Sequence, residues 1–157
     1  FHRYVLVYLY VKHRHDGYQP KDMFQKLPRV TVQLPMYNED TVAERVIKAT
    51  CQIDYPLDRL EIQVLDDSTD HSAEIARKAC EEMAAKGYPI KYIHRADRKG
   101  YKAGALAEGM KQASGDFIAI FDADFIPPRD MMNSEPTTPI SEYATASLTP
   151  VRMCGAA

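Results

Sequence analysis

Residues 117–124 read FIAIFDAD, an apolar run that stops at two carboxylates placed one residue apart. Five consecutive side chains without a polar group, Phe117 to Phe121, are typical of a central parallel strand that is buried on both faces. In an open α/β sheet, ligands bind beyond the carboxyl ends of the strands, so Asp122 and Asp124 are expected in a crevice there. Two neighbouring carboxylates favour a hard divalent cation, Mg²⁺ or Mn²⁺, held together with substrate phosphates. The competing interpretation of an isolated Asp-x-Asp is a pair of solvated acids.

Three more strands are expected before this one, at residues 30–35, 60–65 and 90–93, with helical segments between them. The spacing predicts helices from about residue 38 to 50, 71 to 86 and 101 to 113. Strands that alternate with helices imply right-handed crossovers. The sequence therefore predicts an α/β fold with a mostly parallel sheet and helices on both faces.

Some details of these helices are predicted as well. Asn38 is expected to open the first helix, with Thr41 and Glu44 spaced as a capping box. Gly87 is expected to end the second helix and Gly115 the third. The third helix is expected to bury four residues of one face: Ala103, Leu106, Met110 and Ala113.

The two ends of the chain differ from the part between them. Residues 1–11 are strongly apolar and aromatic and are followed by a basic cluster, Lys12 to His15. This pattern fits an edge strand or amphipathic helix of the domain, or the end of a transmembrane helix with a cytoplasmic basic flank, which we favour. Residues 12–28 are predicted to be a linker into the domain at 29–130. Residues 131–157 show no sustained period and are predicted to be an atypical, weakly ordered tail.

Composition excludes several classes of protein. A length of 157 residues suits one hydrophobic core. The net charge of -2 argues against nucleic acid as the main partner. Three cysteines without a C-x-x-C spacing support neither a disulfide framework nor a zinc site.

Polar residues follow the first, second and fourth expected strands, and parallel strands bring such residues to one edge. They are Tyr37 and Glu39, Asp66 and Asp67, and Asp122 and Asp124. A basic loop at 94–102 ends in Lys102, in the first turn of a helix, where a cation is unfavourable unless an anion binds nearby. Together these residues predict a pocket for a nucleoside diphosphate. They offer acids for a base or ribose, an aromatic ring for stacking, a pair of metal ligands and a cation for phosphate.

Four segments in this order resemble the family 2 glycosyltransferases. They are LPMYNE at 34–39, VLDDSTD at 64–70, RKGYKAGALAEGM at 98–110 and FDADF at 121–125. Within the family, the second and third segments look like the cellulose synthase-like branch related to glucomannan mannosyltransferases. The resemblance implies the nucleotide-binding half of a GT-A fold, incomplete in this chain. It further implies an inverting enzyme that transfers glucose or mannose from UDP-glucose or GDP-mannose to a growing β-glycan acceptor.

The resemblance also assigns roles to the residues. It places Tyr37 near the nucleobase, Asp66 and Asp67 at the base and ribose, and Lys102 at the phosphates. Asp122 and Asp124 would hold the metal that bridges the diphosphate, and Asp122 and Glu39 belong to the nucleotide-binding set. The resemblance implies a catalytic domain on the cytoplasmic side of a membrane.

The expected general base, in a T-E-D-like motif, and the Q-x-x-R-W motif have no counterpart here, and the chain has no tryptophan. The catalytic base is therefore not identified, and we expect donor binding without a complete catalytic cycle. A catalytically dead nucleotide-binding module is the main alternative. A sugar-nucleotide nucleotidyltransferase fits less well, because the first strand is not followed by a glycine-rich basic loop.

Overall fold

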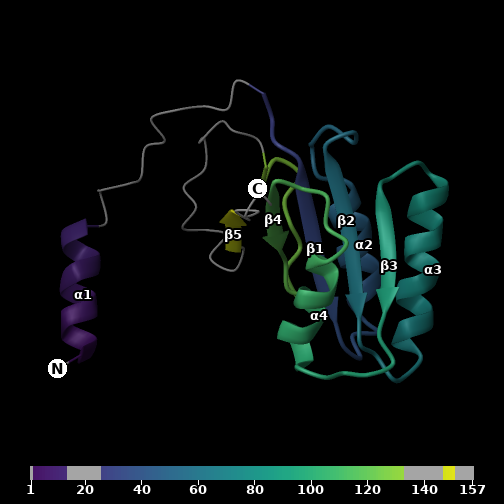
Figure 1. Cartoon of the computed structure of the whole chain (residues 1–157). Coiled ribbons are helices and arrows are strands. Elements are labelled where there is room, and N and C mark those ends of the chain that lie inside the picture. Colours follow the sequence, from purple (N-terminus) through teal and green to yellow (C-terminus); the bar gives the residue numbers. More distant parts are fainter. Residues whose placement is uncertain (1, 14–25, 133–146, 151–157) are drawn as a thin grey trace, which may run out of the picture.

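The computed structural model describes residues 2–13, 26–132 and 147–150. The elements are α1 (His2–His13), β1 (Val30–Met36), α2 (Ala43–Cys51), β2 (Leu60–Asp66), α3 (Ser72–Ala85), β3 (Ile90–His94), α4 (Tyr101–Met110), β4 (Phe117–Ile120) and β5 (Ser147–Pro150). Strand order is β3-β2-β1-β4-β5, and the first four strands are parallel. Figure 1 shows α4 against one face of the sheet and α2 and α3 against the other. The predicted α/β fold with a mostly parallel sheet is confirmed.

The two faces of the central strands differ in chemistry. The face toward α2 and α3 is apolar and buried, and carries Val32 and Leu34 of β1 beside Ile62 and Val64 of β2. The face toward α4 is mostly polar although it is equally buried; Leu65 is an apolar residue on it, and its polar residues pair across the two strands. Thr31 lies opposite Glu61, and Gln33 lies opposite Gln63. Successive residues of a strand point to opposite faces, so one alternating pattern produces both layers.

Glu61 anchors the segment that leads into β4. One carboxylate oxygen accepts hydrogen bonds from Thr31 Oγ1 at 3.0 Å and from the backbone N and Oγ of Ser114 at 2.8 and 2.7 Å. The other accepts from Lys91 Nζ at 2.8 Å. Burial would raise the pKa of Glu61, but the bonds from Lys91, Ser114 and Thr31 outweigh burial and lower the pKa to about 2. The start of β4 is thereby tied to β1 and β2.

Helix α4 packs through small residues, which differs from the expected face. The buried positions are Ala105 and Gly109, whereas Ala103 and Met110 are exposed. A Cβ at Gly109 would lie only 2.6 Å from the side-chain nitrogen of Gln33, so the helix lies too close to the polar face for a larger side chain.

Three other local predictions were wrong. Helix α2 begins at Ala43 after Val42 without a side-chain cap, so Thr41 and Glu44 do not form the expected capping box. Asn38 does not open this helix and lies in a loop with a φ of 53°. Helix α4 ends at Met110, so Gly115 is not its cap; Gly115 instead lies so close to Thr31 that a Cβ would clash. Gly87, in contrast, follows α3 with a φ of 90°, as a helix-ending glycine should.

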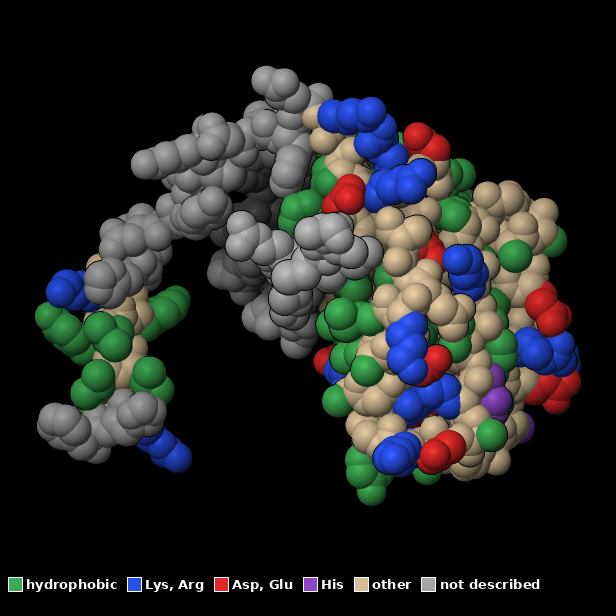
Figure 2. Space-filling view, in the orientation of Figure 1, with side chains coloured by type: hydrophobic (Ala, Val, Ile, Leu, Met, Phe, Trp, Pro, Cys, Tyr) green, Lys and Arg blue, Asp and Glu red, His purple; other side chains and the backbone are tan. Residues whose placement is uncertain are grey.

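The ends of the chain are described only in part. Residues 2–13 form a helix, which excludes an edge strand there, and apolar side chains such as Tyr4, Leu6 and Tyr10 are exposed on it. Figure 2 shows hydrophobic side chains on both sides of this helix. Within the described ranges, no helix is both long and apolar enough to cross a bilayer. The tail contributes β5, which pairs antiparallel with β4 and was not predicted; most of 131–157 lies outside the described residues.

Candidate functional site

A pocket of about 430 Å³ opens where the chain leaves the carboxyl ends of β1, β2 and β4. Because β1 lies between β2 and β4, the three following loops are neighbours. The pocket is lined by six of the seven predicted site residues: Tyr37, Glu39, Asp67, Lys102, Asp122 and Asp124. Arg98 lines it as well. The expected convergence of polar residues is therefore present.

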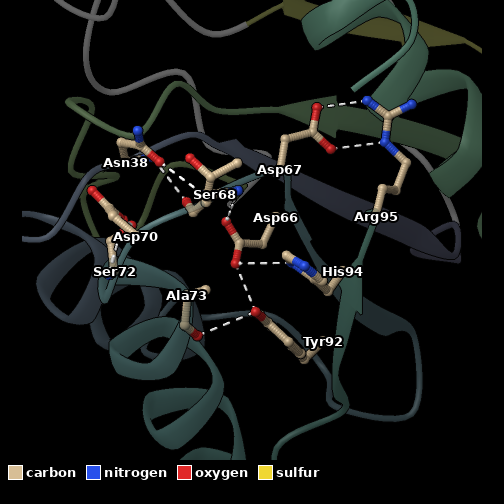
Figure 3. A network of polar contacts seen from close by, with 11 residues as sticks. Asn38, Asp66, Asp67, Ser68, Asp70, Ser72, Ala73, Tyr92, His94 and Arg95 are labelled. Atoms are coloured by element: carbon tan, nitrogen blue, oxygen red, sulfur yellow. Dashed lines mark hydrogen bonds and ion pairs between the residues drawn. The ribbon is translucent and has the colours of Figure 1, made fainter. Parts of the chain in front are cut away.

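Asp66 is the predicted site residue that does not line this pocket. It is the last residue of β2 and is 0% exposed. Its Oδ2 accepts a hydrogen bond from Tyr92 Oη at 2.6 Å and lies 3.5 Å from His94 Nδ1, while its Oδ1 accepts from Ser68 N at 2.9 Å (Figure 3). Burial and the bond to Asp66 raise the pKa of Tyr92. The strand continues through Asp66, so alternation sends its side chain toward α3 and leaves Asp67 at the pocket.

Asp67 is held by an arginine that the sequence did not assign to it. Arg95 Nε and Nη2 donate to the two oxygens of Asp67 at 2.7 and 2.5 Å, a bidentate pair visible in Figure 3. The hydrogen bond to Asp67 raises the pKa of Arg95. Arg95 also donates to the carbonyl oxygens of Lys99 and Tyr101, so it fixes the loop before α4. The parallel pairing of Asp66 with His94 puts Arg95 beside Asp67, and that register is the signal that could have predicted the pair.

The loops after β1 and β2 are joined to each other. Asn38 N donates to Ser68 Oγ at 2.8 Å, and Thr69 N donates to Asn38 Oδ1 at 3.0 Å. The left-handed backbone at Asn38 places both groups toward the second loop. These bonds fix the loop that carries Tyr37 relative to the one that carries Asp67.

The basic loop approaches the pocket with Arg98. The guanidinium carbon of Arg98 lies 3.2 Å from the ring centroid of Tyr37 and 5.1 Å from that of Tyr101. The sequence predicts a basic loop at 94–102 but does not indicate a role for Arg98. The spacing of Arg98 and Tyr101, three residues apart, could have predicted only the contact between those two, because Tyr37 is distant in the sequence.

Asp122 and Asp124 follow β4 on the side of the pocket opposite β2. Lys102, in the first turn of α4, forms an ion pair with Asp122. Among the described residues, no cluster of three His, Cys, Asp or Glu side chains could hold a metal ion by itself. Two neighbouring carboxylates nevertheless suit a hard cation that takes its other ligands from phosphate and water. The donor set therefore fits Mg²⁺ or Mn²⁺ bound together with a diphosphate.

Residues 31–134 match the profile of Glycosyl transferase family 2. The chain belongs to this family. The chain is 50% identical over 109 residues to probable glucomannan 4-beta-mannosyltransferase 6 of Oryza sativa subsp. japonica, a match that covers 67% of this chain and 19% of the relative. It is 49% identical over 110 residues to glucomannan 4-beta-mannosyltransferase 7 of Arabidopsis thaliana, and this match covers 68% of this chain and 20% of the relative. The chain thus spans about one fifth of the length of these relatives.

A solved structure of the same architecture is the mannosyltransferase PcManGT from Pyrobaculum calidifontis in complex with GDP-Man and Mn²⁺. The TM-score is 0.68 at 30% sequence identity, and the match covers 83% of this chain and 40% of the other chain. The comparison agrees with a partial GT-A-like domain.

Proposed function

We propose that the chain is the donor-binding half of a nucleotide-sugar-dependent hexosyltransferase that extends a β-glycan with inversion at the anomeric carbon. One observation carries this proposal: acids, an aromatic and a lysine from three strand ends and α4 line a single pocket. The donor would be GDP-mannose or UDP-glucose. The similarity to glucomannan mannosyltransferases and to a GDP-Man complex supports a mannosyl donor.

The pocket suggests a role for each residue. Tyr37 would pack near the nucleobase, Asp67 and Glu39 would accept hydrogen bonds from the base or ribose, and Lys102 would bind phosphate oxygens. Asp122 and Asp124 would hold Mg²⁺ or Mn²⁺, which neutralises charge on the leaving diphosphate when bound. Asp66 is left out of this set, because its buried carboxylate orients Tyr92 and Ser68 instead.

The acceptor hydroxyl needs a general base, and none of the pocket carboxylates is assigned to that step. We therefore expect the chain to bind donor without transferring sugar. In the complete enzyme the acceptor would be a glycan, and the exposed apolar helix α1 is consistent with a membrane association through the flanking segment. A catalytically dead nucleotide-binding module shares the same pocket and the same binding.

Calorimetric titration of the full chain with GDP and UDP, each with and without Mn²⁺, tests the proposal. The variant is Asp122→Asn/Asp124→Asn, and the matched control is Asp58→Asn/Asp130→Asn, which removes two exposed carboxylates outside the pocket. We expect the wild type and the control to bind GDP or UDP in a Mn²⁺-dependent way. The variant should release no more heat than dilution does. Circular dichroism verifies folding. Equal binding by the variant and the control would refute the metal role, and sugar transfer by the chain would refute the expected lack of a base.

A further inference from the structure

Arg98 is held in the pocket by two aromatic rings. Its guanidinium carbon lies 3.2 Å from the centroid of Tyr37 and 5.1 Å from that of Tyr101. A guanidinium stacks favourably on aromatic faces. A guanidinium that stacks on an aromatic ring by its face keeps its N–H edge for a ligand.

Arg98 also differs from the neighbouring basic residues in its hydrogen bonds. Arg95 is paired with Asp67, and Lys102 is paired with Asp122. Arg98 Nε is buried and has no hydrogen-bond partner among the described residues. A buried donor without a partner is costly, so an acceptor atom placed at this edge is favoured.

The position of Arg98 indicates which part of a donor it would meet. Its loop follows β3 and enters from that side of the sheet, whereas Asp122 and Asp124 follow β4 on the other side of β1. Arg98 contacts Tyr37, the aromatic residue proposed to lie beside the nucleobase. The N–H edge of Arg98 therefore belongs to the base end of the pocket and not to the metal end.

The two candidate bases present different edges to an arginine. Guanine offers two neighbouring acceptors, O6 and N7, which match the paired donors of a guanidinium. Uracil offers two carbonyl oxygens separated by an N–H donor, which opposes a cationic donor pair. We propose that Arg98 is the residue that reads the nucleobase and makes the pocket prefer guanine to uracil. This inference rests on the proposed donor-binding function.

The test compares dissociation constants of GDP and UDP in the presence of Mn²⁺ for the wild type and Arg98→Lys. Lysine keeps the charge and removes the paired donors. The matched control is Lys99→Arg, which is also charge-preserving and lies outside the donor pocket. A bidentate arginine–guanine contact corresponds to discrimination of about tenfold or more. We expect the wild type and the control to bind GDP at least about tenfold more tightly than UDP. In Arg98→Lys the preference for GDP should fall below about threefold, because GDP binding becomes weaker.

A second arm begins with wild-type protein alone, so its first result does not depend on the stability of a variant. The analogue 7-deaza-GDP lacks the N7 acceptor, and inosine diphosphate keeps both O6 and N7. We expect wild-type protein to bind 7-deaza-GDP several-fold more weakly than GDP, and inosine diphosphate about as tightly. In Arg98→Lys the penalty for 7-deaza-GDP should disappear.

Three results would overturn the inference, and they differ in what else they affect. Equal weakening of GDP and UDP in Arg98→Lys would make Arg98 a phosphate contact. Wild-type protein that binds both nucleotides equally would leave donor binding in place and remove base reading. A folded wild-type chain that binds neither nucleotide would refute the proposed function itself.

Discussion

Glu61 should make the stability of the fold depend on pH in a predictable direction. Glu61 is 7% exposed, and its carboxylate accepts hydrogen bonds from Thr31, Ser114 and Lys91. A longer bond of 3.4 Å comes from Gln63. These bonds favour the charged carboxylate over the protonated one. The pKa falls from 4.5 to about 2 in the folded protein, so the unfolded chain takes up a proton first as the solution is acidified.

The magnitude follows from this difference in pKa. A fall from 4.5 to about 2 corresponds to about 3 kcal/mol of stability. This contribution is fully present well above pH 4.5, declines below it, and is mostly lost near pH 2. The variant Glu61→Gln keeps the shape without the charge. At pH 7 it should be less stable than wild type by about 3 kcal/mol, and near pH 2.5 by less than about 1 kcal/mol.

Urea unfolding followed by circular dichroism at several pH values measures this difference. Glu81→Gln is the matched control, because Glu81 forms an exposed ion pair with Arg77 and should change the free energy of unfolding by less than about 1 kcal/mol. A difference between wild type and Glu61→Gln that stays constant with pH, or that is below about 1 kcal/mol at pH 7, would refute the linkage argument.

Three further substitutions test the packing around the pocket. Gly109→Ala places a Cβ about 2.6 Å from the amide nitrogen of the glutamine in β1, so we expect a loss of about 1 to 3 kcal/mol in urea unfolding; an unchanged midpoint would show that α4 can shift freely. Tyr92→Phe removes a 2.6 Å hydrogen bond to the buried Asp66 and should cost about 1 to 3 kcal/mol, and a neutral effect would contradict the role given to that bond. Arg95→Lys cannot maintain both bonds to Asp67, so the loop before α4 should be cleaved faster by trypsin at unchanged global stability; an unchanged cleavage rate would argue against the clamp.

Apolar runs predicted the four parallel strands, and the residues that end three of them predicted most of the pocket. Runs such as 117–121 are long and bounded by polar residues, so they are predicted reliably as strands. The assignment of Asp66 depended on where β2 ends. The strand runs one residue further than expected, so Asp66 belongs to it and its side chain lies on the face toward α3, away from the pocket.

The face of α4 could not be predicted from hydrophobicity. The pattern selected Leu106 and Met110, whereas the sheet beneath the helix is polar and close, and only Ala105 and Gly109 fit against it. The strand β5 was missed for a different reason. Its four residues have little pattern of their own and pair with β4 across a long separation in sequence.

The contrast between the two faces of the sheet has a consequence for amide hydrogen exchange. Helix α3 is attached through a continuous apolar layer, so its amide protons should exchange only when the whole domain opens. Helix α4 packs through Ala105 and Gly109 on a surface that includes two glutamines and Leu65, outside that apolar layer, so we expect it to detach in a subglobal opening of lower free energy. Lys102 leaves the pocket whenever this happens. A bound donor would then be detected as slower exchange in α4, with α3 unchanged.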